Sequence, residues 1–222
     1  SLSNIDEVVL GMTHRGRLNV LANIIHKDYS SIFREFDENY INQEFEGSGD
    51  VKYHQGAQGT FTTSLGKNIL VTLAANPSHL ESVDPVVEGI SYAKSIISKK
   101  DVISVLIHGD ASFSGQGVVY ETMQLCKLNG YQTKGSIHLI INNQIGFTTN
   151  PEEARSTPYC SDLAKTFNCP VFHVNAEDPE GCIRAIILSM EIRAKFECDV
   201  FIDLNCYRKY GHNESDEPLF ST

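Results

Sequence analysis

Short apolar runs rich in β-branched residues alternate along the chain with longer segments whose apolar residues recur at helical spacing. The runs have the length and composition of buried parallel strands, and we predict six of them, at residues 8–12, 69–75, 102–107, 137–141, 171–175 and 200–204. Helices are predicted at residues 18–25, 83–97, 118–125 and 178–194, with a short helix and its exit at 29–41. This alternation is typical of the α/β fold class, with a doubly wound, mostly parallel sheet covered by helices on both faces.

The segment between residues 102 and 147 carries the clearest chemical signal. Its two predicted strands lead into Asp110 and Asn143, which are about 33 residues apart, the length of one strand–helix–strand crossover. Neighbouring parallel strands would bring both side chains to the carboxyl edge of the sheet. A carboxylate, an amide and one or two backbone carbonyls form an all-oxygen site that suits Mg²⁺ or Ca²⁺ and is poor for zinc. A diphosphate is the natural co-ligand of Mg²⁺ there.

Composition and charge narrow the class of protein. The chain has 222 residues, of which 41% are hydrophobic, enough to bury the core of one large domain. Its 28 acidic and 18 basic residues give a net charge of −10, so nucleic acid and anionic membranes are poor partners. We find no apolar stretch of transmembrane length and no signal-peptide pattern, and we expect a soluble domain.

The cysteines point to a reducing environment. They show no C-x-x-C spacing, lie mostly in apolar periodic segments, and are Cys126, Cys160, Cys169, Cys182, Cys198 and Cys206. We therefore expect buried, reduced thiols rather than a disulfide framework or a zinc site. Reduced thiols indicate a bacterial cytoplasm or a mitochondrial matrix, and the sequence leaves both open.

Polar residues follow other predicted strands as well. His14, Arg15 and Arg17 come after the first strand, where catalytic loops of α/β sheets gather, although a surface salt-bridge cluster is the alternative interpretation. Asn76 or Ser78 can cap the helix that is expected after the strand at 69–75. A capped helix N-terminus also binds phosphate, so structural capping and cofactor binding are compatible here.

Other polar residues are weaker candidates. Residues 44–66 are rich in glycine and lack periodicity, which predicts a long loop that contains His54. A lone histidine in a loop is most often a solvated surface residue. His212 follows the last strand, where a hydrogen-bonded loop histidine is at least as common as a catalytic one. Arg155 could steady an anion near the site, or it could form an ordinary surface ion pair with neighbouring glutamates.

Seven segments in one order carry a family resemblance: GMTHRGRLNVLAN, GDVKYHQG, NPSHLESVDPVVEG, HGDASFSGQGVVYET, INNQIGFTT, ARSTPYCSDLAK and CYRKYGHNESDEP. They resemble the thiamine diphosphate-dependent dehydrogenase component of the 2-oxoglutarate dehydrogenase complex. The resemblance covers nearly the whole chain. It implies the thiamine-diphosphate-binding variety of the doubly wound fold.

The resemblance also implies roles for individual residues. Mg²⁺ would be held by the side chains of Asp110 and Asn143 and by the carbonyl of Ile145, and it would bridge to the diphosphate of the cofactor. Further cofactor contacts are implied for Arg15, Ser78, Leu80, Ala111 and Ser112. His14 and His54 would be catalytic, and His54 and Ser78 would face the substrate.

The implied reaction is the oxidative decarboxylation of 2-oxoglutarate in the tricarboxylic acid cycle. A succinyl group would pass to the lipoyl group of a partner acyltransferase, and the full-length enzyme would be a homodimer. Two alternatives stay open: a dehydrogenase for 2-oxoadipate or another 2-oxo acid, and a non-catalytic domain that binds cofactor or holds a dimer together. A nicotinamide-binding domain is disfavoured because no G-x-G-x-x-G follows a predicted strand.

The resemblance also bears on domain organisation. In the family, a pyrimidine-binding domain, whose glutamate protonates the aminopyrimidine ring, follows the diphosphate-binding domain. Residues 1–222 stop before such a domain. We therefore expect a single diphosphate-binding domain that belongs to a larger enzyme and is inactive alone.

Overall fold

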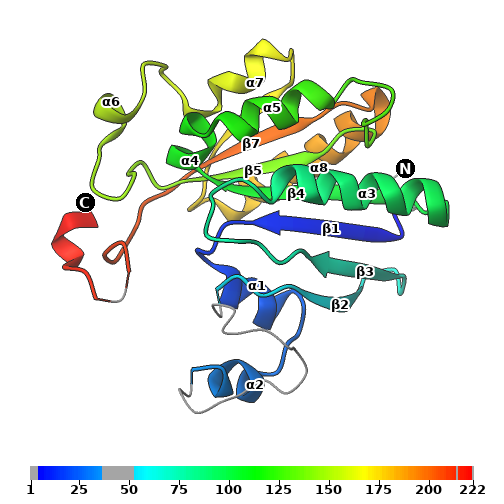
Figure 1. Cartoon of the computed structure of the whole chain (residues 1–222), viewed down its shortest axis with the longest axis horizontal. Helices are drawn as coiled ribbons and strands as arrows, with labels where there is room; N and C mark the ends of the chain where they lie inside the picture. Colours follow the sequence, from blue (N-terminus) through cyan, green and yellow to red (C-terminus); the bar gives the residue numbers. More distant parts are fainter. Residues whose placement is uncertain (1–4, 37–52, 214, 222) are drawn as a thin grey trace.

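A seven-stranded sheet forms the centre of the computed structural model, which describes residues 5–36, 53–213 and 215–221 (Figure 1). The strand order is β2-β3-β1-β4-β5-β7-β6. All neighbouring pairs are parallel except β2 and β3, which are antiparallel at one edge. The predicted doubly wound, mostly parallel α/β sheet is confirmed.

All six predicted strands are present, and a seventh was missed. The strands are β1 (Glu7–Met12), β2 (Ala57–Thr62), β3 (Asn68–Leu73), β4 (Val102–Gly109), β5 (Ile137–Asn142), β6 (Val171–Asn175) and β7 (Val200–Asn205). The prediction of one long loop over 44–66 is wrong for its second part, which contains β2; residues 44–52 lie outside the described residues. Most residues of β2 are exposed, so the strand lacks an apolar period and is defined by its pairing with β3.

The helices follow the predicted alternation. They are α1 (Arg17–Asn23), α2 (Tyr29–Arg34), α3 (Asp84–Ser98), α4 (Asp110–Gly115), α5 (Gly117–Leu125), α6 (Pro151–Ala154), α7 (Leu163–Thr166) and α8 (Pro179–Phe196), with 3₁₀ turns η2 (Cys160–Asp162) and η3 (Pro218–Ser221). The short helix α4, which is not among the predicted helices, begins directly at Asp110. Of the segment predicted at 29–41, α2 accounts for the start, and residues 37–41 lie outside the described residues.

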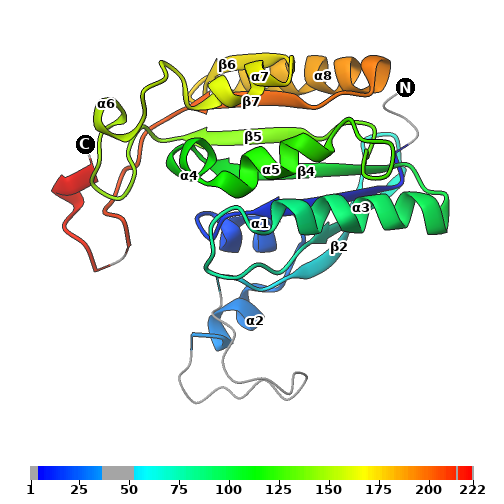
Figure 2. The same ribbon diagram turned by 45° about the horizontal axis from the view of Figure 1, so that its top comes forward.

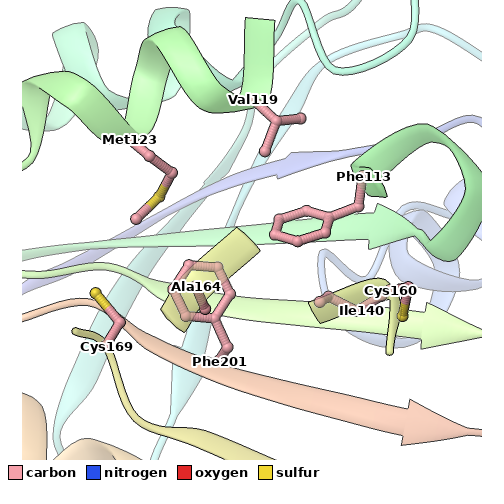
Figure 3. Close-up of a cluster of buried hydrophobic side chains, with 8 residues drawn as sticks. All are labelled: Phe113, Val119, Met123, Ile140, Cys160, Ala164, Cys169 and Phe201. Atoms are coloured by element: carbon pink, nitrogen blue, oxygen red, sulfur yellow. The ribbon is translucent and has the colours of Figure 1, made fainter. Parts of the chain in front are cut away.

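Helices cover both faces of the sheet (Figure 2). On one face, α3 packs over β1 and β4, while α4, α5 and α7 pack over β5 and β7. Figure 3 shows the second of these contacts, in which Phe113 and Met123 lie over Ile140 and Phe201. On the other face, α1 and α8 cover the two halves of the sheet. Because helices cover both faces of the sheet, the polar residues that follow the parallel strands gather at its carboxyl edge.

Helix capping was predicted correctly at one position and wrongly at another. Asp178 caps α8 by accepting a hydrogen bond from the Gly181 amide, as its sequence pattern indicates. Asn76 and Ser78 cap nothing, because α3 begins only at Asp84. A helix that started near Ser78 would place Pro85 in its interior, where proline removes a backbone hydrogen bond; in α3 the proline occupies the first turn.

The prediction of free thiols is confirmed, but burial holds only for Cys160 and Cys169, and the other four cysteines are half-buried. All six cysteines are free. Burial raises the pKa of the Cys160 and Cys169 thiols to about 12, which keeps them protonated and unreactive near neutral pH.

Candidate active site

The ends of β4 and β5 lie side by side, as the spacing of Asp110 and Asn143 predicts. The two strands are parallel, and Gly109 pairs with Ile141. Asp110 is 3% exposed, and burial raises the pKa of its carboxyl group, while the nearby Arg155 opposes this shift. A buried carboxylate in such a place is stabilised by a bound cation. Arg155 therefore lies close enough to Asp110 for its charge to act on that carboxyl group.

The loop after β5 folds onto the first turn of α4. The side chain of Asn143 accepts a hydrogen bond from the Ile145 amide at 3.3 Å, and Gln144 between them has a left-handed backbone with φ of 61°. A Cβ atom added to Gly146 would lie 2.8 Å from the Cβ of Ala111, so loop and helix are in close contact. The structure thus brings Asp110, Asn143 and the Ile145 segment to one place. Their carboxylate, amide and carbonyl oxygens fit a hard cation such as Mg²⁺.

Three histidines gather beside this loop. Burial lowers the pKa of His14, and the charges of Arg15, His212 and His54 lower it further. A guanidinium nitrogen of Arg15 donates to the His212 carbonyl at 2.8 Å. The His212 ring packs edge-on against Phe147, with 4.7 Å between centroids. The structure places His212 with the other two histidines, an arrangement that its sequence position alone did not establish.

Arg17 has a role that neither sequence interpretation covered. It is fully buried, and its guanidinium donates hydrogen bonds to three backbone carbonyls. Their oxygens belong to Met12, Ala74 and Gln55, at 2.9, 3.0 and 2.8 Å. Arg17 thereby joins the end of β1, the end of β3 and the segment that carries His54. It is neither a surface ion pair nor a group that faces the site.

A small cavity of about 10 Å³, which has room for about one water molecule, lies between the ends of β1 and β4. Strand order reverses at this point, since the chain adds β3 on one side of β1 and β4 on the other, and ligands of doubly wound folds bind at such reversals. His14, Leu80, Glu81 and Asp84 are among its lining residues. Ser78 is exposed on the same turn, but it does not line the cavity.

A buried polar network behind the cavity was missed from the sequence. The Ser112 hydroxyl donates to Glu81, whose other oxygen lies 2.6 Å from His108 Nδ1. His108 Nε2 lies 3.0 Å from His138 Nδ1 on β5. Both histidines interrupt apolar strands, and that was the available signal. Cofactor contact was predicted for Ser112, yet in this structure its hydroxyl contacts Glu81 and the Gly109 carbonyl.

Glu81, Asp84 and His108 also form a cluster whose ligand atoms lie within 4.8 Å of one another. Burial and the charge of Glu81 raise the pKa of Asp84 to about 9. At neutral pH, Asp84 therefore keeps its proton and shares it with Glu81. These contacts are those of a proton-sharing pair.

The fold is a doubly wound α/β sheet of the thiamine diphosphate-binding type, and its carboxyl edge is built as the site of a cofactor-dependent enzyme domain. Residues 2–221 match the family model described as the dehydrogenase E1 component. The chain belongs to this family, whose members depend on thiamine diphosphate.

Curated relatives are similar over almost all of the chain. A multifunctional 2-oxoglutarate metabolism enzyme of Mycolicibacterium vanbaalenii is 55% identical over 96% of this chain. Proteins with the same name from Mycobacterium sp. strains JLS and KMS are also 55% identical over 96% of the chain. The chain spans 18% of the length of each of these relatives. Among the residues that the structure describes, no helix is both long and apolar enough to cross a membrane.

Proposed function

We propose that the chain is the diphosphate- and Mg²⁺-binding domain of an enzyme that oxidatively decarboxylates 2-oxoglutarate. The observation that carries this proposal is the close approach of the loop after β5 to Asp110 and Ala111, which gathers hard oxygen donors at paired strand ends. The names of the relatives support 2-oxoglutarate as the substrate. A longer protein would then supply the pyrimidine-binding domain.

In this proposal, Asp110, Asn143 and the carbonyl of Ile145 hold Mg²⁺. Ala111, Arg15 and Leu80 are proposed to contact the cofactor, whereas Ser112, whose hydroxyl donates to Glu81, would act through its place in the first turn of α4. When bound, thiamine diphosphate supplies the electron sink for decarboxylation. The protein's part is to bind and orient the cofactor and to exclude water from the cavity at the end of β1.

The histidines handle the substrate and its protons. The pKa of His14 is lowered, so its imidazole is neutral near pH 7 and can accept a proton or a hydrogen bond. His54 is buried beside it and, with Ser78, is proposed to bind the acid. A dicarboxylic acid needs more donors than pyruvate does, and Arg15 adds a cation to this side of the site. A wrong acid would leave such donors unpaired.

The proposal extends to partners and location. The succinyl group passes to the lipoyl group of an acyltransferase, and the working enzyme is a homodimer. The six free cysteines support a reducing compartment, either a bacterial cytoplasm or a mitochondrial matrix. The 222-residue domain alone would be inactive, because half of the cofactor pocket comes from the pyrimidine-binding domain.

The test is calorimetric titration of the natural full-length protein with thiamine diphosphate in the presence of Mg²⁺. We expect saturable binding by the unaltered protein and at least about 100-fold weaker binding by Asp110→Asn, because a charged cation ligand is lost. Asp199→Asn is the matched control, since Asp199 is also buried but begins the opposite edge of the sheet. Equal binding by Asp110→Asn would refute the cation site.

Turnover then decides the substrate. We expect decarboxylation of 2-oxoglutarate to exceed that of 2-oxoadipate and pyruvate under the same conditions. Preference for 2-oxoadipate would assign the enzyme to that acid instead. Binding of the cofactor with no turnover of any acid would favour a non-catalytic domain.

A further inference from the structure

Asp203, on β7, lies under the loop that carries two of the three proposed cation ligands. We propose that Asp203 is a positioning residue, which fixes both ends of this loop and so sets the geometry of the cation site. The inference rests on the proposed function, because it concerns the same cation. Asp203 does not itself have to touch the metal.

The first contact fixes the start of the loop. The Asn142 side-chain amide donates to one carboxylate oxygen of Asp203 at 3.0 Å. The side-chain oxygen of Asn142 accepts a hydrogen bond from the Gln144 backbone amide at 3.3 Å. Both Asn142 and Asp203 are buried, at 6% and 2% exposed. One side chain therefore links a buried carboxylate to the backbone between the two ligands, Asn143 and Ile145.

The orientation of Gln144 makes this link important. Its backbone is left-handed, a conformation that costs a residue other than glycine of order 1 kcal/mol and persists only where surrounding contacts enforce it. The Gln144 side chain provides one such contact by donating to the Cys206 carbonyl at 2.8 Å. Asn142 provides the other. Without it, the loop loses the hydrogen bond that selects this conformation, and the Asn143 and Ile145 oxygens lose their fixed direction.

The second carboxylate oxygen of Asp203 fixes the far end of the loop. It accepts from the buried Ser161 hydroxyl at 3.2 Å and lies 3.0 Å from His173 Nδ1. Ser161 belongs to η2, where the loop returns to the core, and His173 belongs to the neighbouring strand β6. One carboxylate thus gathers three side chains from three elements. Second-layer contacts of this kind typically change metal affinity by about 10- to 100-fold when they are removed.

The amide of Asn142 and the carboxylate of Asp203 can be exchanged between the two positions, which gives a sharp test. Asp203→Asn removes the acceptor that Asn142 uses, and Asn142→Asp places two carboxylates against each other. In the double variant, the amide introduced at position 203 can donate to the carboxylate introduced at position 142, while its oxygen still accepts from Ser161 and His173. The introduced carboxylate can also accept from the Gln144 amide, so the original number of hydrogen bonds is restored.

The measurement is the dissociation constant of Mg²⁺ by calorimetry, on the natural full-length protein with thiamine diphosphate held in excess. We expect each single variant to weaken Mg²⁺ binding by about 10-fold or more, and the double variant to return to within about threefold of the unaltered protein. Ser161→Ala is a milder variant that leaves Asn142 in place, and it should weaken binding by about threefold. Asp199→Asn, at the other end of β7, should lower thermal stability without changing the Mg²⁺ constant.

Two outcomes would overturn the inference. If Asp203→Asn and Ser161→Ala change the Mg²⁺ constant no more than Asp199→Asn does, Asp203 has only a structural role. If the double variant binds no better than the weaker single variant, the contact between the two side chains does not set the site. Failure of the unaltered protein to bind Mg²⁺ and thiamine diphosphate would refute the proposed function together with the inference, so the two failures are distinguishable.

Discussion

The carboxyl edge of the sheet has two parts that are held in place by different means. The cation half lies at the ends of β4, β5 and β7 and contains Asp110 and Asn143. The histidine half lies beside the carboxyl ends of β1 and β3. It contains His14, His54 and His212, which come from three different segments of the chain. Strand pairing positions the cation half, since Gly109 pairs with Ile141 and Ile141 pairs with Leu204. The histidine half is assembled from segments that are far apart in the chain. Arg15 and His212, which share a hydrogen bond there, are separated by almost 200 residues.

The difference shows where a site depends on a single residue. Three backbone hydrogen bonds from Arg17 connect the segments of the histidine half. The support of the cation half is shared between the sheet, Asp203 and the buried Arg208, which donates to the Phe147 carbonyl of the loop after β5 at 2.7 Å. Loss of the Arg17 guanidinium should therefore disturb the histidine half far more than the cation half.

Replacing Arg17 by methionine is expected to have the largest effect. Three carbonyls lose their donor inside the protein, and each unsatisfied buried group costs about 1–3 kcal/mol, so we expect local destabilisation of at least about 3 kcal/mol. Amide hydrogen exchange should accelerate in residues 12–17 and 53–57, and much less in residues 137–147.

Arg193 offers the matched control for this change. It is also buried, and it donates to the carbonyls of Gly135 and Val102 at the opposite edge. Arg193→Met should destabilise that edge and leave exchange at residues 12–17 unaffected. Equal acceleration around His14 in both variants would show that Arg17 is not the specific connector of the histidine half.

His54→Ala is expected to have an intermediate effect. Loss of the proposed substrate contact should lower turnover of 2-oxoglutarate by at least about tenfold, or roughly 1.4 kcal/mol of transition-state stabilisation. Affinity for thiamine diphosphate and Mg²⁺ should stay within about twofold, because the cation half is supported separately. Steady-state kinetics and calorimetry on the same preparation check both statements; unchanged turnover and acid affinity would remove His54 from the reaction.

Asp84→Asn is expected to have the smallest effect, and its sign depends on pH. The pKa of Asp84 is about 9 in the fold against 3.8 as its ordinary value, so the folded state binds more protons between these values. The resulting stability is complete below the ordinary pKa and is lost as pH rises toward 9. Asparagine cannot ionise and can still donate to Glu81.

The variant should therefore gain stability relative to the unaltered protein as pH rises. We expect a relative gain on the order of 1 kcal/mol for each pH unit between about pH 6 and pH 8, measured by thermal unfolding at each pH. Glu88→Gln is a useful comparison, because burial also raises the pKa of Glu88, which lies outside the cavity lining. Parallel unfolding curves for Asp84→Asn and the unaltered protein across this range would contradict a shared proton.

The sequence predicted the strand framework of the cation half better than the contacts that assemble the histidine half. The buried strands and the adjacency of Asp110 and Asn143 follow from local apolar runs and one crossover length, and they are confirmed. Strand β2 was missed because an exposed edge strand has no apolar period. The capping predicted for Asn76 or Ser78 was wrong because α3 starts at Asp84, with Pro85 in its first turn. The roles of individual site residues stay predictions.

The buried contacts were beyond the sequence for a different reason. Arg17 lies in a loop motif that also suits a catalytic arginine, and only the packing of three distant carbonyls around it distinguishes the two. Asp203 lies in an apolar strand, where an isolated acid indicates a buried partner but does not identify it. Those partners, on β5, η2 and β6, become neighbours only through the order of strands in the sheet.

Among the strands of the described sheet, β7 is the last in chain order, yet it occupies the place between β5 and β6. During translation, Asn142 and His173 leave the ribosome before the carboxylate that joins them exists. The preceding strands can pair and the helices can pack, but the loop after β5 stays without its anchor until residue 203 has emerged. The proposed cation site would thus be completed only after residue 203 has emerged, later than its ligands Asn143 and Ile145.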